Sequence, residues 1–473
     1  MTHPQVVRVY STYQDPDYES PWQNVAPRGS TGSGVIVGPR QILTGAHVVA
    51  NATFVQVQKQ SDPTKVTARV LAVSHDADLA LLHVDEAAFA RGIRPAVIGD
   101  LPRLRDAVQV VGYPIGGEEV SITEGVVSRI EVQRYEHSQR HLLAVTVDAA
   151  INEGNSGGPV FARGKVVGIA FQALPEAENI GEMVPAPILR RFLDGVAKEK
   201  DPHVPGLGIT TQPLENPALR AHLGMAKHDS GVLITAVQFG SSAWGILQKG
   251  DVLCQLDGLR IADNGTVRYR GQFRCQFDAV IGDHHVGDSL RAKILRGGKA
   301  VSVTMTMQRM AWLVPRTEFD RRPMWFLFGG LVFQRLTAEF LRIWGEQWWD
   351  KAPKELLHLY YSGLRRPEQQ EIVVLAQVLA DAVNVGYEAF HNDVVVAVNG
   401  HAPVDMADFV RRIDAARGEV VLELSSGAKV LLDADAAHAA ERRILSRYHV
   451  PSDRSTDLPR AKRAPSGKRR ARR

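Results

Sequence analysis

A serine surrounded by glycines is the first group in this sequence that could carry out chemistry. Ser156 lies in the stretch Gly154-Asn155-Ser156-Gly157-Gly158-Pro159. Glycines permit backbone conformations in which successive N–H groups point at one spot, where they could stabilise an oxyanion. Glycine-rich turns with a serine are also common in β proteins, so this loop predicts a nucleophile only if a base and a carboxylate lie elsewhere in the chain.

A histidine and an aspartate follow two earlier strand-like runs. His47 comes after the apolar run Val35 to Leu43, and Asp78 comes after the run Val66 to Val73. A serine hydroxyl needs a neutral imidazole to take its proton, and the imidazole needs a carboxylate to fix its tautomer. Asp76 competes with Asp78 for the carboxylate role, and either could instead cap a turn. Position within the motif favours Asp78, which predicts a triad of His47, Asp78 and Ser156.

Three motifs carry a resemblance to a known family. The segments TGAHVV (44–49), DADLALL (76–82) and GNSGGP (154–159) resemble those of the Deg/HtrA (protease Do-like) serine endopeptidases. The resemblance continues through segments 112–117, 123–128 and 177–181 and covers nearly the whole chain except its tail. Within that family the sequence is most similar to the branch with two PDZ domains known from eukaryotic organelles and nuclei, whose second PDZ is divergent.

This resemblance implies a mainly β fold: a chymotrypsin-like double β-barrel followed by two PDZ-like domains. It also implies ATP-independent degradation of unfolded or damaged proteins, and a homo-oligomer that is a trimer or a multiple of trimers. The first thirty residues, with Tyr10, Tyr13, Tyr18 and Trp22, resemble the region through which family members pack as trimers. A plain surface loop is the alternative for that region.

Composition independently favours a large, mostly β, multidomain protein. The chain has 473 residues, of which 44% are hydrophobic, and its 41 glycines separate many short Val/Ile-rich runs. Only two cysteines occur, Cys254 and Cys275, which excludes a disulfide framework and a four-thiolate metal site but leaves one bridge open. No spacing of ligands predicts a metal, and we expect no cofactor.

Changes in charge and proline content predict the domain boundaries. Charged residues and two prolines interrupt the pattern near Lys198 to Pro205, after a helix-like stretch from Pro187 to Ala197. The predicted organisation is a trypsin-like protease domain at 1–200, a first PDZ domain at 203–310, a divergent second PDZ-like domain at 311–450 and a basic disordered tail at 451–473.

The first PDZ-like domain contains a candidate loop for binding a peptide carboxylate. Its residues are Gly206, Leu207, Gly208 and Ile209, and their spacing to Lys249-Gly250-Asp251 supports the resemblance. In such a domain the loop amides grip a C-terminal carboxylate while the peptide adds a strand to the sheet.

The third unit repeats this plan imperfectly, through segments 329–333, 372–378 and 393–400. A long insertion, Leu336 to Arg366, carries Trp344, Trp348 and Trp349 and would obstruct or alter a peptide groove. The resemblance implies an assembly or regulatory element there, and a helix whose tryptophans simply pack is the alternative.

The resemblance also implies the remaining parts of the active site. The oxyanion hole would be formed by Gly154, Asn155 and Ser156. The primary specificity pocket would be lined by Ala150, Ile151, Ala170 and Phe171, which predicts cleavage after small or medium apolar residues rather than after Lys or Arg. Glu153 departs from the small polar residue that the family often carries beside this loop.

The positive charge of the chain is a property of its tail. The net charge is +4, but Arg460 to Arg473 carries eight basic residues and no acid, which leaves −4 on the rest. Such a run could bind nucleic acid, anionic lipid or an import receptor, or could simply keep the protein in solution. No secretory leader is visible, so we expect a cytoplasmic protein, or a periplasmic one if the chain is a processed form. The apolar run Met324 to Phe333 is too short to span a bilayer and predicts buried strands.

Two other classes of function remain open from the residues. The chain could be a holdase chaperone or scaffold with a resting or inactive protease site. It could also be an adaptor that its tail directs to nucleic acid or another anionic surface.

Overall fold

The chain forms two compact units in a computed structural model that describes residues 3–86, 88–114, 119–149, 151, 154–173, 180–458 and 460. Unit 1 comprises Met1–Asp15 and Ala26–Ala311, and unit 2 comprises Pro16–Val25 and Trp312–Arg473. A short segment between the first two strands of unit 1 therefore belongs to unit 2. The described residues are mainly strands, which confirms the predicted mainly β class.

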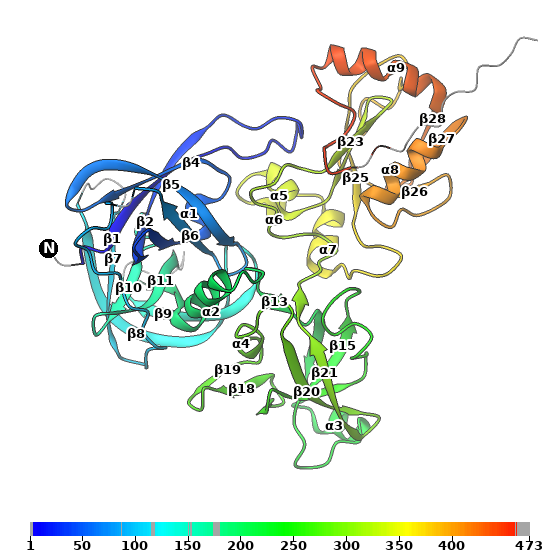
Figure 1. Ribbon diagram of the computed structural model, residues 1–473. Helices are drawn as coiled ribbons and strands as arrows, with labels where there is room; N and C mark the ends of the chain where they lie inside the picture. Colours follow the sequence, from blue (N-terminus) through cyan, green and yellow to red (C-terminus); the bar gives the residue numbers. More distant parts are fainter. Residues whose placement is uncertain are drawn as a thin grey trace, which may run out of the picture. The chain divides into compact units, whose positions relative to one another are not determined.

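Two closed antiparallel barrels make up the first part of unit 1 (Figure 1). The first has the strand order β1-β2-β3-β6-β5-β4, and the second has the order β10-β11-β12-β9-β8-β7. Closure leaves no free sheet edge, and inward Val, Ile and Leu side chains fill each interior. The bounds in the first barrel are β1 Val6–Tyr13, β2 Arg28–Gly38, β3 Gln41–Thr44, α1 Ala46–Val49, β4 Ala52–Lys59, β5 Asp62–Ser74 and β6 Leu79–Val84. The bounds in the second are β7 Ala107–Gly112, β8 Ser121–Arg134, β9 His141–Asp148, β10 Pro159–Ala162, β11 Lys165–Ala173 and β12 Ile180–Pro185.

A helix closes the second barrel at the position that the sequence predicted. Helix α2 spans Ala186–Ala197, begins with Pro187 in its first turn and buries Ile188, Leu189 and Phe192 against β11 and β12. The chymotrypsin-like double barrel is thus confirmed.

The first PDZ-like domain completes unit 1. Its main sheet has the order β14-β15-β16-β20-β21, with β17 paired to β16. Its buried side chains form one continuous hydrophobic cluster with those of the second barrel. Cys254 and Cys275 are both free, so the single bridge that the sequence left open is not formed. The bounds are β13 Pro205–Gly206, β14 Ile209–Pro213, α3 Pro217–His222, β15 Val232–Val237, β16 Val252–Leu256, β17 Leu259–Arg260, β18 Thr266–Tyr269, β19 Phe273–Gln276, α4 Asp278–Ile281, β20 Ser289–Arg296, β21 Lys299–Thr306 and β22 Gln308–Arg309.

Unit 2 is built around one sheet with the order β23-β24-β25-β26-β27-β28. The run Met324 to Phe333 forms the buried strands β23 and β24, as predicted. The tryptophan-bearing insertion folds into short helices, and Trp349 on α6 is 54% exposed. Residues 453–455, which the sequence assigned to the tail, pair with β23 instead, whereas residues 461–473 lie outside the described residues. The bounds are β23 Trp325–Phe328, β24 Leu331–Arg335, α5 Ala338–Leu341, η1 Arg342–Trp344, α6 Trp348–Lys351, α7 Lys354–Ser362, β25 Val373–Val378, β26 Asp393–Val398, α8 Met406–Ala415, β27 Glu419–Leu424, β28 Lys429–Asp433 and α9 Ala434–Arg447.

Candidate active site

The structure brings His47 and Asp78 into contact at one end of the first barrel. His47 lies on α1, directly after β3, and Asp78 directly precedes β6. Strands β3 and β6 are paired neighbours, so these two positions meet at the same edge. The imidazole Nδ1 lies 2.7 Å from Asp78 Oδ2, and the backbone N–H of His47 donates to Asp78 Oδ1 at 2.8 Å.

Both pKa values favour the charged pair. Burial lowers the pKa of His47, but the attraction of the Asp78 carboxylate outweighs it and raises that pKa above 6.5. Burial raises the pKa of Asp78, but the charge and hydrogen bond of His47 outweigh it and lower that pKa below 3.8. A carboxylate bound at Nδ1 holds the proton there, so the neutral imidazole has Nε2 available as the base.

Asp76, the competing carboxylate, has other partners. Its Oδ1 lies 3.4 Å from Arg140 Nη1, and its Oδ2 accepts from the backbone N–H of Val204 at 3.0 Å. Arg140 also donates to the carbonyls of Val204 and Pro205, immediately before the GLGI loop. The two side chains are about 8% exposed, so this ion pair is buried. Geometry therefore assigns Asp78, not Asp76, to His47.

The nucleophile loop lies against the turn that carries His47. The Ser156 carbonyl accepts from the backbone N–H of Ser33 at 2.9 Å. Gly157 has a φ of +80°, and a Cβ there would come within 2.4 Å of Thr44 Oγ1 and 3.0 Å of the Gly45 nitrogen. Only glycine fits this close approach, which explains the glycine after the serine.

The structure shows no hydrogen bond between His47 and Ser156 among the described residues. His47 Nε2 is buried and has no hydrogen-bond partner among them. Hydrogen bonds of catalytic groups are often long without substrate and tighten when it binds. Asp78 thus orients the candidate base, and the backbone of the loop that carries the candidate nucleophile lies next to the turn before His47.

The predicted oxyanion loop contains a buried amide without partners. Asn155 is 1% exposed, and both its Oδ1 and Nδ2 lack a hydrogen-bond partner in the described structure. The Gly154 carbonyl accepts from the Ser33 hydroxyl at 2.7 Å, and because a trans peptide sets C=O and N–H on opposite sides, the N–H of Asn155 points away from Ser33. An unsatisfied buried amide costs stability, which is typical of functional loops.

Sequence reasoning missed Ser33. Its hydroxyl donates to Gly154, accepts from the backbone N–H of Tyr113 at 2.8 Å, and its carbonyl accepts from Thr44 Oγ1 at 2.6 Å. Ser33 therefore joins the nucleophile loop to the first barrel. Its position between two glycines at the start of an apolar run was the available signal.

Two further histidines near His47 and Asp78 were also missed. His137 lies on the turn between β8 and β9, with its ring centroid 6.3 Å from that of His47, and its Nε2 lies 2.9 Å from Nδ1 of His75. His137 adds to the electrostatic lowering of the Asp78 pKa. No spacing in the sequence links these three positions.

The described residues of the predicted specificity pocket lie beside the nucleophile loop. The Ala170 carbonyl accepts from the N–H of Gly157 at 2.8 Å, and Phe171 packs on Tyr135 with ring centroids 4.4 Å apart. Ile151 is buried against Gly181. Ala150 and Glu153 lie outside the described residues.

A glutamine and a glutamate next to this pocket were not predicted. Gln172 Nε2 donates to Glu182 Oε2 at 2.5 Å across the β11–β12 pair. Glu182 is 1% exposed, and burial raises its pKa. An acid is therefore present near the pocket, although Gln172 donates a hydrogen bond to it and burial raises its pKa.

In the predicted carboxylate loop of the first PDZ-like domain, the carbonyl groups accept hydrogen bonds from donors in the same domain. Gly206 O accepts from Ser242 Oγ, Leu207 O from the N–H of Ala243, and Gly208 O from the N–H of Gln238. The N–H groups of Leu207 and Gly208 donate to no group in the described part of the chain.

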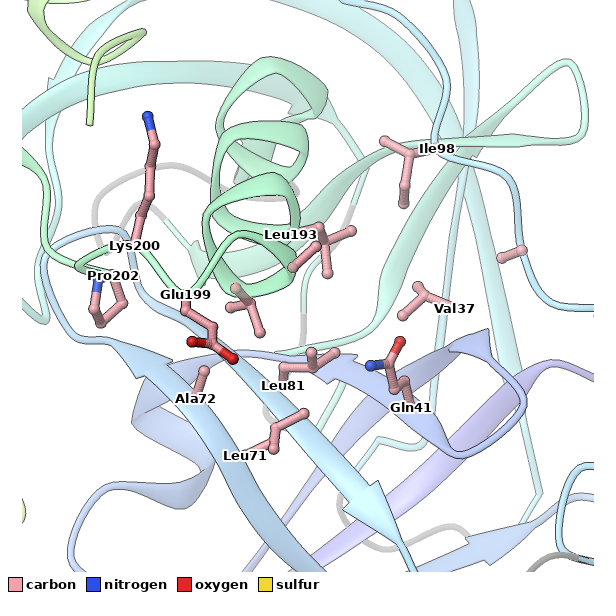
Figure 2. A pocket seen from close by; sticks show the side chains of 13 residues that line it. Val37, Gln41, Leu71, Ala72, Leu81, Ile98, Leu193, Glu199, Lys200 and Pro202 are labelled. Carbon is pink, nitrogen blue, oxygen red and sulfur yellow. The ribbon is translucent and has the colours of Figure 1, made fainter. Parts of the chain in front are cut away.

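A separate apolar pocket of about 610 Å³ opens elsewhere in unit 1 (Figure 2). Its walls include Leu71, Leu81 and Leu193, and none of the predicted site residues lines it. It is not the candidate active site.

Comparison with known proteins agrees with this architecture. Residues 32–169 match the trypsin-like peptidase domain family, and residues 314–457 match a PDZ domain family. An HtrA-type protease, AlgW, solved with a tripeptide, has the same fold at a TM-score of 0.50 and 23% identity, covering 65% of this chain and 94% of that one.

Two relatives from Arabidopsis thaliana match 96% of this chain. Protease Do-like 2, chloroplastic, is 38% identical over 75% of its own length, and Protease Do-like 4, mitochondrial, is 35% identical over 85% of its own length. Within the described residues, every helix is too short or too polar to cross a membrane. The chain belongs to the Deg/HtrA (Protease Do-like) family and is a serine endopeptidase.

Proposed function

We propose that this protein hydrolyses unfolded or damaged proteins without ATP, with Ser156 as nucleophile, His47 as base and Asp78 as the group that orients the base. The single observation that carries the proposal is the 2.7 Å contact between His47 and Asp78, with Nε2 unpaired beside the Ser156 loop. Acyl transfer of this type requires a nucleophile, a base and a carboxylate that orients the base, and the arrangement supports all three.

The reaction follows from these roles. Ser156 Oγ attacks the scissile carbonyl carbon while His47 Nε2 takes the hydroxyl proton, and Asp78 stabilises the imidazolium that forms. The amine leaves with the proton from His47, and an acyl-enzyme remains. Water, deprotonated by His47, then hydrolyses the ester and restores the serine.

The oxyanion would be stabilised by the backbone N–H groups of Gly154, Asn155 and Ser156. Loss of one such donor typically costs about 10²- to 10³-fold in rate. Ser33 supports this loop because its hydroxyl fixes the Gly154 carbonyl. We propose that a substrate carbonyl completes the alignment of Ser156 with His47.

We further propose cleavage after small or medium apolar residues. Ala170 is fully buried, and Ile151 and Phe171 are nearly so, which supports an apolar pocket. The Glu182 carboxyl is held by Gln172, and its raised pKa disfavours the charge that would attract Lys or Arg.

The first PDZ-like domain is proposed to bind peptide C-termini. The unpaired N–H groups of Leu207 and Gly208 support a carboxylate site, and the open edge of β14 supports addition of a peptide strand.

We also propose assembly into trimers or multiples of trimers, an anionic partner for the basic tail, and a cytoplasmic location. Light scattering, salt-dependent nucleic-acid binding and cell fractionation test these three in turn.

The decisive experiment compares casein cleavage by the wild type, Ser156→Ala and a control, Ser128→Ala. Ser156→Ala should lose at least about 10⁴-fold in rate, since the nucleophile is gone. Ser128→Ala removes the hydroxyl of an exposed serine on β8 that donates only to the Thr146 carbonyl, so cleavage should persist. Undiminished cleavage by Ser156→Ala would refute the triad. If the wild type cleaves nothing but suppresses aggregation as well as Ser156→Ala does, the result would instead support the alternative hypothesis of a holdase chaperone with an inactive protease site.

A further inference from the structure

The second PDZ-like domain repeats the strand order of the first but adds a strand at one edge. The first domain has the order β14-β15-β16-β20-β21, and the second has β24-β25-β26-β27-β28 preceded by β23. Strands β14 and β24 therefore occupy equivalent places in their sheets. Each strand directly follows a glycine with a left-handed backbone conformation, Gly208 before β14 and Gly330 before β24. The edge of β14 that faces away from β15 is unpaired among the described strands, whereas the same edge of β24 is covered.

The strand that covers β24 comes from the chain itself. β23 pairs antiparallel with β24 from Trp325 opposite Gln334 to Phe328 opposite Leu331. The two strands are joined by Gly329 and Gly330, with φ values of +55° and +86°, which suit a tight two-residue hairpin. A peptide that added to β24 would have to displace this hairpin strand.

The next edge is covered as well. The N–H of Leu327 donates to the Asp453 carbonyl at 2.7 Å, and the N–H of Ser455 donates to the Trp325 carbonyl at 3.0 Å. Residues 453–455 thus act as a further strand beside β23. PDZ domains bind peptides by strand addition, and within the described residues the edge of β24 where a peptide would add is already occupied.

What this domain does hold is the segment Pro16–Val25, here called the N-terminal loop. The loop is a closed turn: Pro16 bridges to Asn24, the N–H of Asp17 donates to the Gln23 carbonyl, and the Asp17 carboxylate accepts from the N–H groups of Glu19 and Ser20. It belongs to unit 2, although β1 before it and β2 after it belong to unit 1.

Two side-chain amides of the sheet bind the main chain of this loop. Gln334 Nε2 on β24 donates to the Tyr18 carbonyl at 2.8 Å, and Gln377 Nε2 on β25 donates to the Glu19 carbonyl. Gln334 is fully buried, and without Tyr18 its Nε2 would lose the hydrogen bond that the structure gives it. A glutamine at this position is explained by the loop.

Two aromatic side chains anchor the loop. Tyr18 is 9% exposed and meets Phe340 edge to face, with ring centroids 6.4 Å apart. Trp22 meets Trp325 of β23 in the same way at 5.5 Å. The strand that closes the peptide edge therefore also carries one of the contacts for the loop.

We propose that the second PDZ-like domain has an internal ligand, the N-terminal loop of its own chain, in place of a peptide C-terminus. The domain binds a folded turn. Two of its glutamines donate hydrogen bonds to main-chain carbonyls of the turn, and two aromatic side chains of the turn pack against it. Its role is to hold the connection between β1 and β2, so the chain passes between the two units at three places: after residues 15, 25 and 311.

Amide hydrogen exchange of the full chain tests this, in a Ser156→Ala background that prevents self-cleavage. Trp22→Ala should speed exchange at the N–H groups of the loop, including those of Asp17 and Gln23, by about 10- to 100-fold, because an aromatic anchor is lost. The matched control is Trp349→Ala, an exposed tryptophan of the same unit, which should leave these rates unchanged. Equal rates in Trp22→Ala and the wild type would overturn the proposal.

A milder variant covers the case in which Trp22→Ala unfolds unit 2, which the amides of β27 and β28 would report. Gln377→Ala removes only the amide that binds Glu19, and should speed loop exchange by about 2- to 10-fold with β27 and β28 unchanged. Protection that disappears on dilution would also overturn the proposal, because the loop would then come from a second copy.

Peptide binding gives an independent test. A fluorescein-labelled decapeptide ending in valine should bind one site per chain, and Gly208→Leu in the first domain should remove all of it. A second site that survives Gly208→Leu would contradict the closed edge. If the wild type binds no peptide at all, the proposed role of the first domain fails, and the exchange experiment still decides the internal ligand.

Discussion

The two PDZ-like domains share a strand plan but differ at the edge where such a plan takes a ligand. In the first domain, β14 ends its sheet, and the N–H groups of Leu207 and Gly208 have no acceptor within the described residues. In the second, β23 covers β24, and residues 453–455 cover β23. An unpaired edge is a template for another strand, so its neighbours, rather than the domain plan, decide whether a peptide can bind.

The domains also differ in how they are connected to the rest of the chain. The core of the first is continuous with that of the second barrel. Arg140 donates to the Pro205 carbonyl, directly before the predicted carboxylate loop, and lies 3.4 Å from Asp76, two residues before Asp78. The second has its own hydrophobic clusters and holds the N-terminal loop. We therefore expect a structural change beside the first domain to shift Asp78 and lower kcat/KM, and the equivalent change in the second domain to leave kcat/KM unaltered.

The strongest test of this difference removes one buried arginine from each domain's surroundings. Arg140→Met leaves the buried Asp76 carboxylate without its ion pair, which should cost unit 1 about 3 to 5 kcal/mol and reduce kcat/KM about 10-fold or more by displacing Asp78. Urea denaturation and cleavage of a fluorogenic peptide measure the two effects.

The matched change is Arg454→Met in unit 2, where Arg454 lies 2.8 Å from Asp414 and both side chains are similarly buried. It should cost unit 2 a similar free energy of unfolding and leave kcat/KM unchanged. A drop in kcat/KM as large as that of Arg140→Met would show that the second domain reaches the triad too.

Glycine substitutions compare the two edges directly. Gly208 has a φ of +69°, and a Cβ there would lie 2.2 Å from the Ser241 Cβ, so Gly208→Ala must move the carboxylate loop. Peptide affinity should fall about 10- to 100-fold. Gly330 has a φ of +86°, and a Cβ there would lie 2.4 Å from the Leu379 carbonyl oxygen. Gly330→Ala should destabilise unit 2 without changing peptide affinity in fluorescence anisotropy, and a loss of affinity would speak against the closed edge.

The units should also respond to pH in different windows. The Asp78 carboxylate raises the pKa of His47 above 6.5, so the base is protonated and kcat/KM falls as pH drops through a value above 6.5. In unit 2, the hydrogen bond from Arg443 lowers the pKa of Asp381 below 3.8. Stability from that pair is fully present above about pH 3.8 and is lost as pH falls through the lower folded pKa. A kcat/KM profile that is flat down to pH 5 would contradict the raised pKa of His47.

The contact of His47 with Asp78 in the candidate site could be predicted because both residues lie in short motifs at strand ends. His47 and Asp78 each follow a strand-like run, and the glycines around Ser156 mark a loop with special backbone conformations, so local sequence was enough to select them. Ser33 was missed because its role consists of three hydrogen bonds to segments far away in the chain.

The differences between the two PDZ-like domains could not be predicted for a related reason. The run Met324 to Phe333 was predicted as buried strands, but strand pairing depends on tertiary contacts and on register, which hydrophobicity does not specify. Tyr18 and Trp22 were expected at a trimer contact or in a surface loop, yet their partners Phe340 and Trp325 lie some three hundred positions further along the chain. The first ten of the 23 residues assigned to the tail include a strand partner of β23, which charge alone does not reveal.

The smallest expected effect concerns the insertion that the first domain lacks. Trp349 is 54% exposed and lies in the four-residue helix α6, so Trp349→Ala should change the free energy of unfolding by less than about 0.5 kcal/mol and leave peptide affinity and kcat/KM unaltered. An exposed tryptophan is, however, a typical anchor for another protein. If the insertion is an assembly element, light scattering will show a lower mass for Trp349→Ala than for the wild type at equal stability. An unchanged mass would leave packing of Trp344 and Trp348 as the role of the insertion, and would confine the difference between the two domains to their edges.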